Sequence, residues 1–282
     1  MSIARALGNA ISGLTATARG TEAVAANLAN ASTPGYARRD LVVSAQTAGG
    51  NAGGVRVDGV TRAVNASVLS ESRLAEAARA DATTRLDFAT RIEDAIGIAG
   101  NTGSLGSALS DFQTALASAA SRPDDEIRLT QVVDKATTLA SRLNALSDEV
   151  QAARTEADQA IATDVATLNT ALAQVADLNR KIAVLEADGS DPSSLYDQRQ
   201  GIISEISKIV PVQEVTRAAG AVALFTAEGA VLLDGTRPTE LSFTPAGQVT
   251  ADRTAGSGLS MLTQNGVELT QSQMRLYAGL RP

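Results

Sequence analysis

Few residue types in this sequence could carry out acid–base or nucleophilic chemistry. The 282 residues contain neither His nor Cys, so the usual general base, the thiolate nucleophile and the commonest metal ligands are absent. The sequence also contains no phosphate-binding loop, nucleophile elbow or dinucleotide fingerprint. Catalysis or cation binding would therefore have to depend on carboxylates.

The best candidate for a cation site is the segment Asp188 to Asp191, where two carboxylates flank a Gly-Ser pair. A calcium loop of this kind needs a bidentate glutamate to close it, and Arg199 occupies that position. We favour a solvated turn between two helices, with Asp191 or Ser193 capping the second helix. We therefore expect no metal ion, no cofactor and no catalytic residue.

Two further charged clusters have structural explanations. Asp124, Asp125 and Glu126 precede an apolar periodic segment, where acidic residues complement the dipole of a helix N-terminus. Arg38 and Arg39 are too few for a nucleic-acid patch, and the net charge of -7 also argues against nucleic-acid binding. On an exposed strand, these arginines could contact an acidic neighbouring subunit.

The composition favours closely packed helices. Hydrophobic residues make up 44% of the chain but aromatic residues only 2%, so alanine must supply much of the core. Polar residues interrupt the apolar segment Ala6 to Ala18, which argues against a cleaved signal peptide. No run of about 18 apolar residues is present, so we expect no membrane span.

The N-terminal segment has the apolar spacing of a coiled-coil helix, with large residues recurring at steps of three and four. A seam this rich in Ala, Thr and Gly is marginal as an isolated helix. We therefore expect the segment to become ordered on assembly and to form an assembly interface. The predicted interface residues are Ile3, Leu7, Ile11, Leu14, Val24 and Leu28.

The sequence predicts where this helix ends. Asn30 stands at the position of a helix C-cap, and Thr33 to Tyr36 fits a type II turn. In such a turn Pro34 presets the second position and Gly35 supplies the positive φ of the third. After the turn we expect a short extended stretch, a flexible glycine-rich link at 49–54 and one short strand at 55–60.

Four further helices follow from the apolar periodicity, and a period of two after Pro211 predicts β-strands. The longest helix would have roughly 60 residues and extend on the order of 90 Å. The predicted helices cover Arg62–Ile96, Leu105–Leu116, Val132–Leu185 and Leu195–Ile209. The predicted strands are Val212–Val215, Val222–Phe225, Val231–Leu233 and Leu241–Phe243.

Together these elements predict a mainly α fold, in which a long antiparallel helical bundle or coiled coil carries a small β-rich domain. We predict three parts. They are the N-terminal helix, turn and link (1–60), the helical bundle (61–210) and a β-rich domain that is incomplete (211–282).

The segment Ala26 to Tyr36 resembles the N-terminal signature shared by bacterial flagellar axial proteins of the rod, hook and hook-to-filament junction. In that family the N-terminal helix packs with a C-terminal helix in the tubular core of the axial structure. The residues that carry the resemblance are Asn27, Leu28, Asn30, Thr33, Pro34, Gly35 and Tyr36.

Within the family, the segments Leu195 to Arg199 and Gly201 to Ile206 are similar to those of the hook-associated proteins at the junction. Such proteins continue well beyond the length of this chain and end in the C-terminal helix. The resemblance therefore implies a member that lacks its C-terminal part.

The resemblance implies a structural adaptor between hook and filament, located outside the cell in the flagellum and exported by the type III apparatus without a cleaved signal peptide. The implied partners are further copies of the chain, the hook protein, the second hook-associated protein, and the export apparatus with its chaperone. Nucleic acid, a membrane span and cofactors are not implied.

Two alternatives remain open at this point. The chain could be another flagellar axial protein, of the hook or distal rod. It could also be a soluble coiled-coil scaffold or signalling protein, in which case residues 1–60 would be ordered in the isolated chain.

Overall fold

The computed structural model describes residues 3–48, 51–98, 100–253 and 259–269. The described parts of Met1–Ala77 and Thr167–Glu240 form one compact unit. Those of Ala78–Ala166 and Leu241–Met274 form a second. Helices α2 (Ala66–Ile96) and α4 (Glu126–Ala187) each contribute residues to both units.

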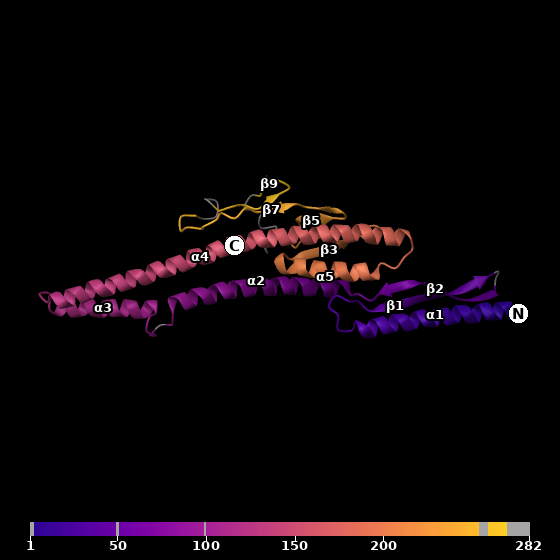
Figure 1. The fold of residues 1–282 in the computed structure, drawn as a ribbon, viewed down its shortest axis with the longest axis horizontal. Coiled ribbons are helices and arrows are strands. Elements are labelled where there is room, and N and C mark those ends of the chain that lie inside the picture. The colour runs from indigo at the N-terminus through magenta and orange to yellow at the C-terminus, as the bar shows by residue number, and fades with distance from the viewer. Residues whose placement is uncertain (1–2, 49–50, 99, 254–258, 270–282) are drawn as a thin grey trace. The chain divides into compact units, whose positions relative to one another are not determined.

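The first unit begins with α1 (Ile3–Ala29), which lies beside an antiparallel hairpin of β1 (Arg39–Ala48) and β2 (Asn51–Arg62) (Figure 1). We call α1, β1 and β2 together the arm. The expected flexible link at 49–54 is wrong for Gly53 and Gly54, which belong to β2, while residues 49–50 lie outside the described part. Both glycines lie at an irregularity of the β1–β2 pairing, between the pairs Ala45–Val55 and Thr47–Ala52, and Gly54 has φ +96°.

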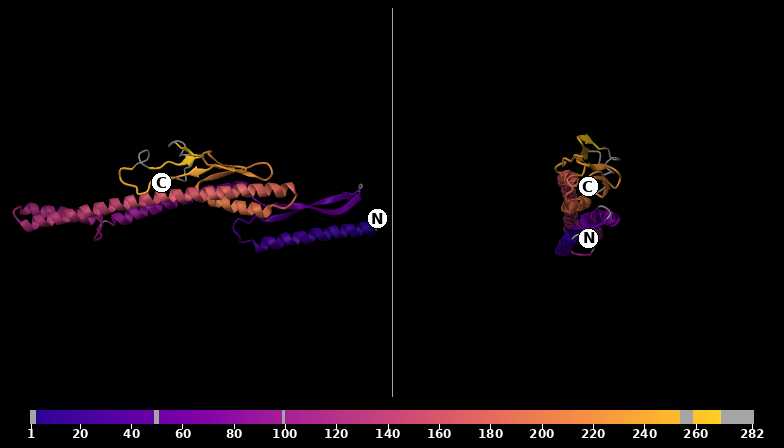
Figure 2. Two further views of the ribbon diagram at one scale, coloured as in Figure 1. Left: turned by 45° about the horizontal axis from the view of Figure 1, so that its top comes forward. Right: turned by 90° about the vertical axis from the view of Figure 1, so that its right-hand side faces the viewer.

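The rest of the first unit has an α/β core in which α5 (Ser193–Ile209) lies along the last turns of α4 (Figure 2). A four-stranded antiparallel sheet of order β3-β4-β5-β6 completes it. Its strands are Val212–Thr216, Val222–Thr226, Val231–Asp234 and Arg237–Pro238. The fully buried side chains include Leu168, Leu172, Val175, Ile182, Ile203, Ile206, Leu224, Leu232 and Leu233.

The second unit is held together by small residues and by polar side chains of α4. Helix α3 (Leu105–Ser121) buries Ala108, Ala115 and Ala119, which permit close helix approach. The segment that begins at Leu241 is attached to α4 by Asp158, whose Oδ2 accepts a hydrogen bond of 2.6 Å from the backbone N–H of Ala246. This segment carries three short antiparallel strands, β7 (Leu241–Ser242), β8 (Thr263–Gln264) and β9 (Val267–Glu268).

The predicted fold class is confirmed, since long helices carry small antiparallel sheets. Helix α2 begins at Ala66 instead of Arg62 because Arg62 pairs with Arg39 in the hairpin, and because Asn65 Oδ1 caps the helix by accepting from the N–H of Val68. None of the helices in the described part of the chain is both long and apolar enough to span a membrane. The division into 1–60, 61–210 and 211–282 stays a prediction.

Candidate assembly interface

Helix α1 carries two opposite stripes that differ in side-chain size. The stripe facing the hairpin is half-buried and is made of small or polar residues. At one end of the contact Ser12 Oγ accepts a hydrogen bond of 3.1 Å from the N–H of Val55, and Leu41 lies over Gly20. The residues of this inner stripe are Asn9, Ser12, Gly13, Ala16, Gly20, Ala23, Ala26 and Asn27.

The opposite stripe of α1 contains the large apolar residues, and all of them point away from the hairpin into solvent. Their exposed fractions range from 56% at Ile11 to 89% at Ile3, and none of the residues of α1 is buried. An amphipathic helix normally turns such residues toward its own core. The six predicted interface residues, Ile3, Leu7, Ile11, Leu14, Val24 and Leu28, therefore form one uncovered surface, which we call the outer stripe.

Asn27 fixes the hairpin to the end of α1 with both ends of its amide group. Its Nδ2 donates to the carbonyl of Arg39 at 2.9 Å, and its Oδ1 accepts from the N–H of Arg39 at 2.8 Å. The Tyr36 hydroxyl donates to the same Oδ1 at 2.9 Å. Asn27 and Tyr36 of the predicted motif thus hold the strand that leaves the turn.

The other motif residues shape the turn itself. Asn30 follows α1 directly, and its Oδ1 accepts a hydrogen bond of 3.2 Å from the Thr33 hydroxyl. The N–H of Tyr36 donates to the carbonyl of Thr33, and Gly35 has φ +81°. The predicted helix end and the positive φ at Gly35 are therefore confirmed.

The turn is attached to α5 through Asp197. The carboxylate accepts hydrogen bonds from the N–H of Ala37 at 3.2 Å, from Arg39 Nη2 at 3.3 Å and from Arg62 Nε and Nη2 at 3.0 and 2.6 Å. Gly35 lies so close that an added Cβ would stand 3.6 Å from the carbonyl oxygen of Asp197. Arg39 thus has an acidic partner in its own chain and Arg38 pairs with Asp40, while a contact of these arginines with a neighbouring subunit stays a prediction.

Sequence reasoning missed the function of Asp197, since the segment Leu195 to Arg199 served only as a mark of resemblance. The buried Arg199 of that segment donates from Nη1 to Asn179 Oδ1 and to the carbonyl of Gly220, both at 2.7 Å. Asn179 in turn donates to the carbonyl of Val222 at 2.9 Å. These contacts join α4, α5 and the sheet.

The ring of Tyr196 contacts both Arg62 and Arg199. The guanidinium carbons of Arg62 and Arg199 stand 5.4 and 4.9 Å from the centroid of its ring, within the range of cation–π attraction. Its hydroxyl donates to Glu186. Burial, followed by this hydrogen bond, raises the pKa of Tyr196 to about 12.

Asp191 and Asp125 accept hydrogen bonds from backbone N–H groups at the starts of α5 and α4. Asp191 Oδ1 accepts from the N–H of Ser193 at 2.9 Å, and Asp125 Oδ1 accepts from the N–H of Ile127 at 3.0 Å. Within the described ranges no group of three or more His, Cys, Asp or Glu residues could hold a metal ion. The acidic residues at 124–126 thus lie at the N-terminus of α4, as predicted, whereas the N-cap of α5 is Pro192 and not Asp191 or Ser193.

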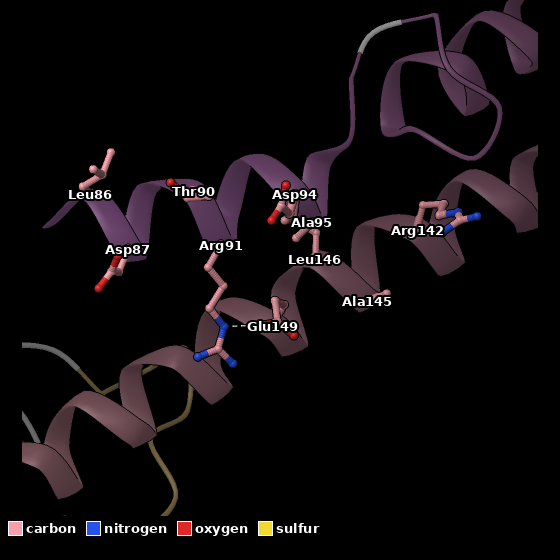
Figure 3. A pocket seen from close by; sticks show the side chains of 10 residues that line it. All are labelled: Leu86, Asp87, Thr90, Arg91, Asp94, Ala95, Arg142, Ala145, Leu146 and Glu149. Atoms are coloured by element: carbon pink, nitrogen blue, oxygen red, sulfur yellow. Dashed lines mark hydrogen bonds and ion pairs between the residues drawn. The ribbon is translucent and has the colours of Figure 1, made fainter. Parts of the chain in front are cut away.

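An open groove of about 650 Å³ lies between α2 and α4 in the second unit (Figure 3). Arg91 crosses it to form ion pairs with Glu149 and Glu156. Most of the other side chains that line it are aliphatic or charged, such as Leu86 and Asp94.

Comparison with known proteins identifies two families along the chain. The family described as "Flagellar hook-associated protein FlgK helical domain" matches residues 89–276, and "Flagella basal body rod protein" matches residues 7–36. "Flagellar hook-associated protein 1" of Salmonella typhimurium is 29% identical over 247 residues, which is 85% of this chain. The proteins of the same name from Escherichia coli and Bacillus subtilis are each 27% identical, over 85% and 74% of this chain.

This chain spans less than half of those relatives, namely 44%, 45% and 43% of their lengths. A similar fold is found in "The structure of the flagellar hook junction protein FlgK from Burkholderia pseudomallei". The TM-score is 0.59 at 20% sequence identity, and the match covers 72% of this chain and 34% of that one.

Proposed function

The chain belongs to the family of the flagellar hook-associated protein FlgK, and from that premise we propose that it is a structural subunit at the junction between hook and filament. It acts as an adaptor that joins neighbouring subunits through the outer stripe of α1. Hook protein, the second hook-associated protein and further copies of the chain are its proposed partners there. The export apparatus with its chaperone would deliver it to this extracellular site.

The observation that supports this proposal best is the outer stripe itself. Burying one large aliphatic side chain contributes about 1.5–3 kcal/mol, and the stripe holds six such residues that are all exposed. Association has to overcome the loss of translational and rotational freedom, about 4–15 kcal/mol. A stripe of this length can offset that loss when another apolar helix covers it.

We propose no catalytic role for the chain. Asp125 and Asp191 bond to backbone N–H groups at helix starts, and the groove between α2 and α4 is crossed by an ion pair. Its proposed function is mechanical.

The test replaces Leu7 and Leu14 together by serine in a bacterium that lacks its own copy. Both side chains are exposed, at 60% and 72%, so we expect the purified variant to keep its helix content and unfolding temperature. We expect hooks without filaments and loss of swimming, because the interface can no longer bury apolar area. The control replaces the exposed Thr15 and Thr17 of the same helix by serine, which should leave swimming unchanged.

Two outcomes would contradict the proposal. Normal filaments in the Leu7→Ser, Leu14→Ser variant would exclude the outer stripe as the interface. Cells that lack the chain altogether distinguish the remaining possibilities, because loss of the hook itself would indicate a rod or hook protein and normal swimming a soluble scaffold.

A further inference from the structure

The arm is joined to α5 by a cluster that we call the latch, formed by Asp197, Arg39, Arg62 and the backbone N–H of Ala37. The side chains of Asp197, Arg62 and Arg39 are only 14%, 13% and 23% exposed. Hydrogen bonds to an ionised partner are roughly twice as strong as neutral ones, and partial burial protects these from screening. The latch is therefore a strong local contact at the base of the hairpin.

The register of the hairpin makes the carboxylate necessary. Arg39 and Arg62 stand directly opposite each other in the β1–β2 pairing, and like charges directly opposite across two strands are destabilising. Asp197 accepts from both guanidinium groups and so places a negative charge between the two positive ones. Without that carboxylate the two arginines would repel each other at the point where the arm meets α5.

Each arginine of the latch also contacts an aromatic ring. Arg39 stands over the ring of Tyr36 in the arm, at 5.2 Å from its centroid, and Arg62 stands over the ring of Tyr196 in α5, at 5.4 Å. Arg39 therefore loses little additional freedom when it binds Asp197, whereas the contact of Arg62 with Tyr196 adds to the attachment of the arm to α5. One ring belongs to each side of the latch, so closing the latch joins arm and α5.

We propose that Asp197 is a positioning residue for assembly: by closing the latch it fixes the arm on α5, so that the outer stripe of α1 has a single orientation relative to the core of the first unit. This inference rests on the proposed function, because the stripe matters as an interface. It gives the otherwise unexplained Leu195 to Arg199 segment a physical function. A subunit with an open latch would present the same stripe in many orientations and would add to an assembly slowly.

Amide hydrogen exchange of Asp197→Asn in the full chain tests the latch directly. The N–H of Ala37 is bonded to Asp197, whereas the N–H of Arg39 is bonded to Asn27 inside the arm. We expect protection of Ala37 to fall about tenfold or more, which corresponds to losing one charge-assisted hydrogen bond. Arg39 should keep its protection to within about threefold and serves as the internal control.

Arm orientation is measured separately by spin labels, which is simple because the chain has no native cysteine. Labels at Thr15→Cys in α1 and Glu228→Cys beside the sheet are both at exposed positions of the first unit. We expect one narrow distance distribution in the parent chain and a broad one in Asp197→Asn. The inference thus replaces the expectation that the N-terminal segment becomes ordered on assembly, because α1 already bonds to the hairpin within the chain. The matched control is Glu205→Gln, an exposed carboxylate of the same helix α5, and Arg62→Gln carries the test if Asp197→Asn fails to fold.

Unchanged exchange at Ala37 together with a narrow distribution in Asp197→Asn, or an equally broad one in Glu205→Gln, would overturn the inference. Both measurements use purified chain and involve no assembly. A failure of the junction proposal, shown by normal filaments in the Leu7→Ser, Leu14→Ser variant, is therefore distinguishable from a failure of the latch.

Discussion

Replacing Asn27 by alanine should open the end of the arm without unfolding the rest of the chain. The amide makes three hydrogen bonds of 2.8–2.9 Å, two with the backbone of Arg39 and one with the Tyr36 hydroxyl. Each contributes about 0.5–1.5 kcal/mol net, and water can replace part of them because the site is half-buried. We therefore expect a loss of about 2 kcal/mol, equivalent to about thirtyfold in the opening equilibrium of this segment.

Hydrogen exchange at the N–H of Arg39 measures this opening. The matched control is Asn9→Ala, because Asn9 lies on the same inner stripe and is half-buried, but makes no side-chain hydrogen bond within the described part of the chain. The control also measures the gain in helix propensity, about 0.6 kcal/mol or less, that any Asn to Ala change brings inside a helix. Equal protection of the Arg39 N–H in both variants would refute the conclusion that Asn27 fixes the hairpin to the end of α1.

Three other substitutions test separate parts of the structure. Gly54→Ala should destabilise the arm by about 2 kcal/mol in thermal unfolding, because Gly54 has φ +96° and an added Cβ collides with α1; Gly59→Ala, with φ +147° but nothing within 4 Å, should cost less. The pKa of Tyr196 is raised from 10.0 to about 12, by burial and then by the bond to Glu186, so the stability that this proton contributes is complete below pH 10 and is lost as the pH rises through about 12. Tyr196→Phe should remove that alkaline step from unfolding curves recorded against pH, and an unchanged step would contradict the assignment. Asp158→Ala leaves a backbone N–H without its partner and should cost about 1–3 kcal/mol in denaturant unfolding, whereas a change below about 0.5 kcal/mol would show that this contact is dispensable.

The helices were predictable because their signal is local. The apolar residues of α4 repeat every three or four positions over its whole length, and proline ends or precedes several helices. The observed helix boundaries differ from the predicted ones where another element takes up the same residue. Arg62, for example, pairs in the hairpin and does not enter α2. Periodicity alone contains no information on such competition.

The hairpin and the latch could not be predicted in the same way. The alternation of β1 and β2 is interrupted by irregularities after Val42 and Ala45, so the period of two is lost in both strands. Asp197 lies 158 residues from Arg39 along the chain, and no local pattern links positions that far apart. The six residues of the outer stripe are all exposed on α1, and their role as an assembly interface stays a prediction. The sequence did not reveal that small residues on the other side of α1 would take up the intramolecular contact.

The large apolar residues on the exposed face of α1 have a consequence for the chain before it assembles. A freely diffusing copy exposes a continuous hydrophobic surface, and such surfaces self-associate as readily as they bind the correct neighbour. The useful lifetime of an unassembled copy must therefore shorten as its concentration rises. Polar substitutions in the outer stripe should lengthen that lifetime, although they abolish incorporation of the chain into the assembly.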